Sequence, residues 1–368
     1  MKDQEIFVTK PSLPPLTEFL PYLQKIWDTR LLTNQGPFHE QLEKELCTYL
    51  GVKAISLFAN GTGALVAALQ ALRLTGEVIT TPFSFVATAH SIVLSGLKPV
   101  FVDIEPNTLN LDPSKIEAAI TDKTTAIMPV HCYGHPCDVE AIQLIADKYG
   151  LKVIYDAAHA FDVECHCGSV LTHGDLSVLS FHATKVFNTF EGGAIVCENL
   201  EIKKQIDQIK NFGIVNELDI PAVGFNGKMS EFNAALGLLQ LKHLKNVVEQ
   251  RKTIDQCYRD KLNGVPGIRV IKIAEQKANY AYFPILVSTE YPLTRDALYK
   301  KFKDSGIHVR RYFYPLISNL LPYQGMSSAK ILDLPNANSA SEQVLCLPIY
   351  PDLHITEVER IVELIRSQ

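Results

Sequence analysis

The 368-residue sequence has little of several features that would narrow its class at once. No uninterrupted apolar run approaches the roughly 20 residues that a membrane-spanning helix needs, and the first five residues show no apolar signal-peptide core. Basic residues are not in excess, because the net charge is -5, so no basic surface favours nucleic acid or anionic lipid. We expect a cytoplasmic protein that binds neither nucleic acid nor membranes.

Cysteine is too scattered for a disulfide framework, with eight residues spread through a chain of enzyme size. Cysteines and histidines nevertheless fall together in two short stretches, 131–137 and 165–173. Their members are His131, Cys132, His135 and Cys137, then Cys165, His166, Cys167 and His173. Neither spacing matches the two-knuckle pattern of structural zinc sites. We therefore expect reduced thiols, loop histidines and no metal.

Between about residues 50 and 200 the chain alternates short apolar stretches with amphipathic ones. Strands are expected at 54–58, 77–80, 99–102, 126–130, 152–155, 176–180 and 194–197. The turn at 60–63 precedes a helix expected at 64–74, and Asp112 and Asp138 are typical helix caps. This alternation predicts an α/β fold with a mostly parallel sheet covered by helices on both faces.

The pattern changes after residue 229. A long helix is expected over 229–263, and a Gly/Pro turn at 264–267 is a candidate seam between domains. Beyond it we expect strands at 268–273 and 281–287, a helix at 293–302, an extended segment at 306–312 and a last helix at 355–366. The sequence thus predicts a large α/β domain, 1–250, that binds a cofactor, and a small α+β domain, 251–368. The long helix can belong to either domain.

Two charged residues stand where predicted strands end. Asp156 follows the apolar run 152–155, and Lys185 comes five residues after Ser180, ahead of two glycines at 192–193. A carboxylate for the pyridine nitrogen and an amine for a Schiff base are what pyridoxal phosphate requires. The alternatives are a helix-capping aspartate and an ordinary surface lysine.

Weaker signals surround these two residues. The turn at 60–63 opens a helix, and its N–H groups suit a phosphate, although a plain turn explains it equally well. Phe83 and Phe85 follow the next strand, where an aromatic can stack on a planar ring or belong to the core. His159 either bonds the phenolic oxygen of the cofactor or is a loop histidine.

Taken together, these segments resemble the sugar aminotransferase family of fold-type I pyridoxal phosphate enzymes, over essentially the whole chain. The segments that carry the resemblance are 33–36, 60–65, 82–88, 129–131, 156–160, 180–185, 191–193, 224–226 and 346–348. Each piece is common, but the ordered set is specific. The resemblance implies a large, mostly parallel sheet domain followed by a smaller α+β domain.

The resemblance also implies roles for residues around the cofactor ring. Lys185 attaches to pyridoxal 5'-phosphate and moves the proton during catalysis. Asp156 holds the pyridine nitrogen, and Phe85 stacks on the ring. His159 meets the phenolic oxygen, where many members of the family have glutamine.

At the other end of the cofactor, the resemblance assigns the phosphate to Thr62, Gly63 and Ser180. Asn226 reaches the phosphate of the other subunit's cofactor, so the active unit is a homodimer with shared active sites. The chain departs from the family at Lys228, where arginine is usual. Any role of that arginine across the subunit interface does not carry over.

The runs 81–90 and 130–134 are similar to those of family members that make dTDP-4-amino-4,6-dideoxyglucose for O-antigens and lipopolysaccharide. The implied reaction moves an amino group from L-glutamate to a nucleotide-linked ketosugar, dTDP-4-dehydro-6-deoxyglucose. The rivals are amination of a 3-keto isomer and a non-catalytic regulator on the same fold. Related dehydratases have histidine in place of the lysine, so Lys185 argues against that class. The sequence does not choose between Arg310 and Arg311 as a ligand for the donor carboxylate.

Overall fold

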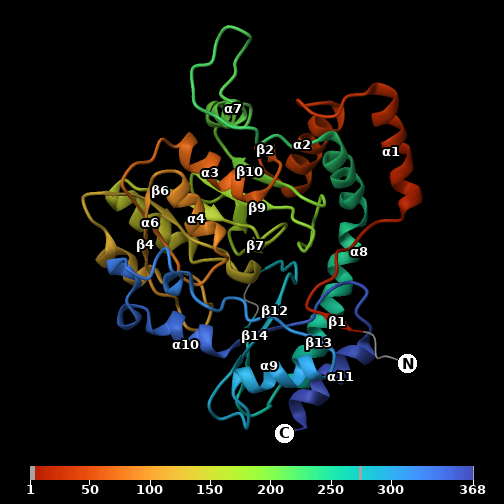
Figure 1. Ribbon diagram of the computed structural model, residues 1–368, viewed down its shortest axis with the longest axis vertical. Helices are drawn as coiled ribbons and strands as arrows, with labels where there is room; N and C mark the ends of the chain where they lie inside the picture. Colours follow the sequence, from red (N-terminus) through yellow and green to blue (C-terminus); the bar gives the residue numbers. More distant parts are fainter. Residues whose placement is uncertain (1–4, 273–275, 368) are drawn as a thin grey trace.

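The computed structural model describes residues 5–272 and 276–367, and a seven-stranded sheet lies at its centre (Figure 1). The strand order is β2 (Ala54–Phe58), β10 (Gly193–Cys197), β9 (Leu176–Ser180), β6 (Lys152–Asp156), β5 (Thr124–Met128), β3 (Glu77–Thr80) and β4 (Lys98–Phe101). β10 runs antiparallel to β2 and β9, and the other neighbours are parallel. The mostly parallel sheet is confirmed, although β4 and β5 start one and two residues before their predicted positions.

Helices cover both faces of this sheet, because alternate residues of a buried strand point to opposite sides. In β2, Ile55 and Leu57 pack in one buried cluster, whereas Ala54 and Phe58 pack in another. The first face is covered by α2 (Pro37–Leu50) and part of α8 (Glu231–Leu262). The second face is covered by α3 (Gly61–Ala71) and α7 (Leu200–Ile209). The helices α4 (Ala87–Leu94), α5 (Pro113–Ile116) and α6 (Val139–Tyr149) complete this lobe.

Polar caps fix the starts of three of these helices. The side chain of Asn60 accepts a hydrogen bond from the Gly63 N–H, Asp112 from Ser114 and Asp138 from Ala141. The predicted starts at Asp112 and Asp138 are therefore confirmed. The helix after the 60–63 turn begins at Gly61, three residues before the predicted start, because Asn60 caps it directly.

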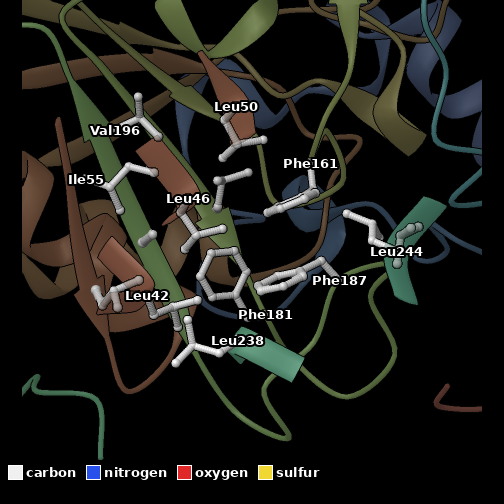
Figure 2. Packing of buried hydrophobic residues seen from close by; sticks show 14 of the residues in the cluster. Leu42, Leu46, Leu50, Ile55, Phe161, Phe181, Phe187, Val196, Leu238 and Leu244 are labelled. Atoms are coloured by element: carbon white, nitrogen blue, oxygen red, sulfur yellow. The ribbon is translucent and has the colours of Figure 1, made fainter. Parts of the chain in front are cut away.

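The largest buried cluster among the described residues includes Phe161, Phe181 and Phe187, which Figure 2 shows close together. Phe161 and Phe187 stack with centroids 4.5 Å apart, and Phe181 meets Phe187 edge-on at 4.9 Å. Phe181 and Phe187 stand at the two ends of the 182–186 segment, and both are fully buried. Such aromatic pairs contribute about 0.5–1.5 kcal/mol beyond area burial, so this segment is held firmly at both ends.

A second lobe is built on a three-stranded antiparallel sheet of β11 (Ile268–Val270), β12 (Phe283–Val287) and β14 (Val344–Leu347). Its helices are α9 (Arg295–Asp304), α10 (Pro335–Gln343) and α11 (Ile355–Arg366). The strand predicted at 268–273 ends at Val270, and residue 273 lies outside the described residues. Near the chain start, β1 (Ile6–Phe7) pairs in parallel with β13 (Ile307–His308), and α1 (Leu16–Thr29) follows it.

The long helix α8 contributes to both lobes. Leu238 and Leu244 belong to the core of the large lobe, whereas Ile254 and Tyr258 belong to that of the small lobe. The predicted domain boundary between residues 250 and 251 falls inside this helix and stays a prediction. None of the helices in the described residues combines the length and the apolar character that crossing a bilayer requires.

Candidate active site

One cavity of about 270 Å³ lies at the carboxyl ends of the parallel strands. Its lining includes six of the predicted site residues, which are Thr62, Phe85, Asp156, His159, Ser180 and Lys185. Gly63 follows Thr62 in the chain but is not among the lining residues, and its N–H donates to Asn60 at 2.7 Å. Asn226 is exposed and does not line this cavity either. The structure therefore gathers residues that are up to 123 positions apart, Thr62 to Lys185, into one site.

Asp156 ends β6 and is buried. Its Oδ2 accepts a hydrogen bond of 2.7 Å from the Thr88 hydroxyl, and its Oδ1 accepts one of 3.1 Å from the Ala158 N–H. Burial outweighs these bonds and raises the pKa of the carboxyl group above its usual value. Within the described residues no lysine or arginine forms an ion pair with Asp156. A cationic group in the cavity would satisfy this carboxylate.

Lys185 reaches the same cavity from the segment after β9. Its Nζ lies 3.5 Å from the Tyr282 hydroxyl. Burial lowers the pKa of the amine to about 8, against an opposing influence from the negative charge of Asp156. The uncharged form, which is the nucleophilic form of an amine, is thus far more populated in Lys185 at neutral pH than in an ordinary lysine.

The hairpin from β9 to β10 sets the position of Lys185. The Phe181 N–H donates to the Gly192 carbonyl at 2.8 Å, and the Lys185 N–H donates to the His182 carbonyl at 2.9 Å. A side chain at Gly193 would come within 2.7 Å of the backbone at residues 60–61. Glycine is therefore required for β10 to pass the start of α3, and the predicted hairpin over the site is confirmed by the β9–β10 pairing.

His159 is fixed in one tautomer by its surroundings. Its Nδ1 accepts a hydrogen bond of 3.2 Å from the Tyr133 N–H, and its ring stacks on Phe313 at an interplanar angle of 4°. Burial first, and then the positive charge of Lys185, hold the pKa of the imidazole well below its usual value. The neutral ring must then carry its hydrogen on Nε2. This nitrogen is a donor suited to a phenolic oxygen.

Phe83 and Phe85, the two aromatic residues that follow β3, lie in different surroundings. Phe83 is fully buried and meets Phe313 edge-on at 5.6 Å, so it is a core residue. Phe85 is 59% exposed and lines the cavity. Of the two, only Phe85 can meet a bound ring.

The start of α3 forms the opposite end of the cavity. Asn60, Gly61 and Thr62 line it, together with Ser180 at the end of β9. A side chain at Gly61 would approach the Cβ of Ser180 to 3.1 Å, so glycine keeps the two segments close. A helix N-terminus beside two hydroxyl groups is a favourable place for a phosphate.

Several lining residues were not assigned from the sequence. Tyr282, Tyr312 and Phe313 come from the small lobe, about 100 or more positions after Lys185, and nothing in the local pattern links them to the cofactor residues. Thr88 lies on the first turn of α4, inside a segment that carries the resemblance, but its bond to Asp156 depends on how α4 packs against the end of β6. Tyr282, Tyr312 and Phe313 join the site only through the packing of the two lobes, and Thr88 joins it through the packing of α4 against the end of β6.

The donor set of the cavity fits pyridoxal phosphate. A buried carboxylate without an ion pair suits the pyridinium nitrogen, and an amine of lowered pKa suits the aldehyde carbon. His159 offers its Nε2–H to the phenolic oxygen, and the start of α3 faces the phosphate end.

Replacing Thr88 with valine should weaken cofactor binding by about tenfold or more, because hydrogen bonds to charged groups contribute about 1.5–3 kcal/mol. The lost bond is the one of 2.7 Å to Asp156 Oδ2, which favours the charged carboxylate. Absorbance titration of the apoprotein with pyridoxal phosphate measures the effect. Thr88→Ser keeps the hydroxyl and should restore most of the affinity, and equal affinity for the valine and serine variants would contradict this role.

Comparisons with known proteins give one consistent result. Residues 16–366 match the model of the DegT/DnrJ/EryC1/StrS aminotransferase family. The chain is 58% identical over 366 residues to a dTDP-4-amino-4,6-dideoxy-D-glucose transaminase of Shigella dysenteriae, and 55% identical over 367 residues to one of Escherichia coli, covering 99% of every chain. A solved structure of DesI in the presence of its TDP-sugar product matches with a TM-score of 0.95 and 34% identity, over 99% of this chain and 93% of that one.

Proposed function

The chain belongs to the DegT/DnrJ/EryC1/StrS aminotransferase family, and we propose that it aminates the fourth carbon of dTDP-4-dehydro-6-deoxyglucose, with L-glutamate as the donor. The observation that carries this proposal is the full-length identity of 58% and 55% to transaminases named for the 4-amino product. The joint presence of Lys185 and Asp156 in one cavity supports the chemistry. The aminosugar would serve surface polysaccharides such as O-antigen.

We propose that the cavity binds pyridoxal 5'-phosphate, where Phe85 would meet its ring and Asp156, at the end of β6, would meet its ring nitrogen. When bound, this cofactor supplies an electron sink that stabilises negative charge on the carbon next to the transferred nitrogen. Asp156 keeps the ring nitrogen protonated, and His159 donates from Nε2 to the phenolic oxygen. Thr62 and Ser180, with the start of α3, bind the phosphate.

Lys185 then has two tasks in the reaction. Its Nζ would take the proton from the α-carbon of glutamate in the first half-reaction and deliver a proton to the carbonyl carbon of the sugar in the second. A pKa of about 8 suits both directions, since the amine can accept and return a proton near neutral pH. Tyr282 and Phe313 close the cavity on the side of the small lobe and keep water from the amine.

Product analysis with two ketosugars tests the assignment. The protein is incubated with L-glutamate and either dTDP-4-dehydro-6-deoxyglucose or its 3-keto isomer, and the new amine is located by NMR. We expect amination at the fourth carbon, because a site shaped for one carbonyl position loses the reactive geometry for the other. Amination only at the third carbon, or only of a UDP- or GDP-sugar, would overturn the substrate but leave the aminotransferase class intact.

We propose further that the active unit is a homodimer with shared sites. The segment 212–223 extends away from the sheet beyond α7 (Figure 1), and it exposes a run of apolar side chains. Leu218 is 95% exposed, Val223 88% and Ile220 60%, which is costly unless another chain covers them. Asn226 follows directly and is exposed outside its own cavity, as a residue that serves the partner's phosphate would be.

Mixing two inactive variants should restore activity if the sites are shared. Lys185→Ala loses the amine, and Asn226→Ala loses the contact with the partner's cofactor phosphate, so a mixed dimer retains one intact site. We expect activity above that of either parent after unfolding and refolding together, with each variant refolded alone as the control. A fully active monomer in sedimentation velocity would contradict the shared site.

A further inference from the structure

A small hairpin outside the active-site cavity brings two cysteines together. It consists of β7 (Glu164–Cys165) and β8 (Gly168–Ser169), with Cys165 paired to Gly168 and His166 and Cys167 at the turn. Gly168 has a φ of +104°, which a side chain would disfavour, so glycine permits this tight reversal. The turn places the sulfur atoms of Cys165 and Cys167 2.6 Å apart.

His173 approaches the same point from the segment that leads into β9. Its Nε2 lies 3.6 Å from the Cys165 sulfur and 3.4 Å from the Cys167 sulfur. Around a tetrahedral zinc ion, with bonds of about 2.3 Å to sulfur and about 2.0 Å to nitrogen, these atoms stand about 3.5 Å apart. The two nitrogen–sulfur separations therefore already match those of a bound ion.

We propose that Cys165, Cys167 and His173 bind a thiophilic metal ion, Zn²⁺ before any other. The ligand atoms of all three residues lie within 4.8 Å of one another. Thiolate and imidazole are the ligands that zinc prefers, whereas magnesium and calcium require oxygen. The sulfur atoms must move apart by about 1 Å to reach tetrahedral geometry, and Cys167 is free to do so because it is exposed at the turn.

We expect the fourth ligand to come from Glu140 or His166. Glu140 stands on the first turn of α6, and its Oε1 lies 3.2 Å from Nε2 of His166. Both are exposed, and together with Cys167 they form a second group of ligand atoms within 4.8 Å. One of these side chains completes a closed, structural type of site.

The site would clamp the hairpin to the start of β9. His173 lies three residues before Leu176, and the other end of β9 carries Ser180 of the cavity. None of the three proposed ligands lines that cavity. The ion would stabilise the folded strand without taking part in amino transfer. The first group of the sequence, His131 to Cys137, does not converge among the described residues, and Cys137 instead contacts the Val130 carbonyl.

A disulfide between Cys165 and Cys167 is the rival explanation for the short sulfur separation. A disulfide would not require a histidine beside it, yet Nε2 of His173 lies within 3.6 Å of both sulfur atoms. The convergence of three ligand types on one point favours a metal.

Cobalt(II) titration of the reduced, chelator-treated holoenzyme tests the proposal, because tetrahedral Co²⁺ bound to thiolate has strong ligand-field and sulfur charge-transfer bands. We expect one equivalent to bind and Zn²⁺ to displace it. Cys167→Ser should abolish the charge-transfer bands or reduce them sharply, and His173→Ala should weaken binding at least tenfold. Cys257→Ser, which changes a partly exposed cysteine on α8, is the matched control and should bind like wild type.

Two further readouts keep the result decisive. Zinc should raise the melting temperature of the wild type and of Cys257→Ser, but not that of Cys167→Ser, because only an ion that binds the folded state stabilises it. Absence of charge-transfer bands in the reduced wild type would overturn the proposal. So would an intact mass two hydrogens lighter, with both thiols unreactive until reductant is added, since that result identifies a disulfide.

Discussion

Replacing Lys185 with alanine should leave the fold intact and lower turnover by at least about 10⁴-fold, because the variant loses both the nucleophile and the acid/base group. Among the described residues that line the cavity, Lys185 is the one lysine. Release of 2-oxoglutarate from glutamate, with the dTDP-ketosugar as acceptor, measures the rate. Lys204→Ala, at an exposed lysine of α7, is the control and should be unaffected.

Replacing Lys185 with arginine distinguishes the effect of the positive charge from that of proton transfer. Lys185→Arg keeps a cation in the cavity but does not lose its proton in the accessible pH range, so it should be as inactive as the alanine variant. The lysine itself has a pKa of about 8, so the neutral fraction grows as the pH rises through that value. The rate at which the apoprotein takes up pyridoxal phosphate should therefore rise between about pH 7 and 9. Turnover of Lys185→Ala within tenfold of wild type would exclude this residue as the acid/base.

Replacing Asp156 with asparagine should lower kcat by about 10²–10³-fold, the usual cost of removing one preorganised charge partner. Asparagine has nearly the same shape, and its amide oxygen can keep the bond from the Ala158 N–H while its NH2 group donates to the Thr88 hydroxyl, so the fold should remain. What it lacks is the negative charge that keeps the ring nitrogen protonated, and buried charge pairs act strongly because water is excluded.

The control for this variant is Asp147→Asn, at an exposed carboxylate on α6. Rates are measured at saturating cofactor, so that weaker binding does not imitate slower chemistry. A kcat of Asp156→Asn within about threefold of wild type would mean that the carboxylate is structural, since a purely structural group would change stability rather than turnover.

Several residues of the site could be predicted from the sequence because they stand where predicted strands end. The strand before Asp156 is read directly from a short apolar run, and parallel strands present their carboxyl ends at one edge of a sheet. Ser180 and Lys185 follow from the same logic on the neighbouring strand β9. The predicted starts of β4 and β5 differ from the observed starts by one and two residues, because an apolar run does not show where the hydrogen bonds of the strand begin.

The remaining parts depend on contacts that no local pattern encodes. Tyr282 and Phe313 reach the cavity only because the second lobe packs against the first, and Thr88 at the start of α4 meets Asp156 at the end of β6. The sequence already groups Cys165 and Cys167 with His173, but their spacing follows no familiar zinc pattern and led us to expect no metal. Only the fold shows that the three side chains converge on one point. The helices α1, α2 and α7 also went unrecognised, because they lie outside the stretches with the clearest alternation.

Chemical trapping of the cofactor tests directly whether Lys185 carries it. The holoenzyme is reduced with sodium borohydride, which fixes pyridoxal phosphate to whichever lysine carries it, and the digested protein is mapped by mass spectrometry. We expect one pyridoxyl group per chain, on Lys185, and none in a Lys185→Ala control. A label on any other lysine, or a protein that carries no label after incubation with the cofactor, would contradict the assignment of this cavity as the active site.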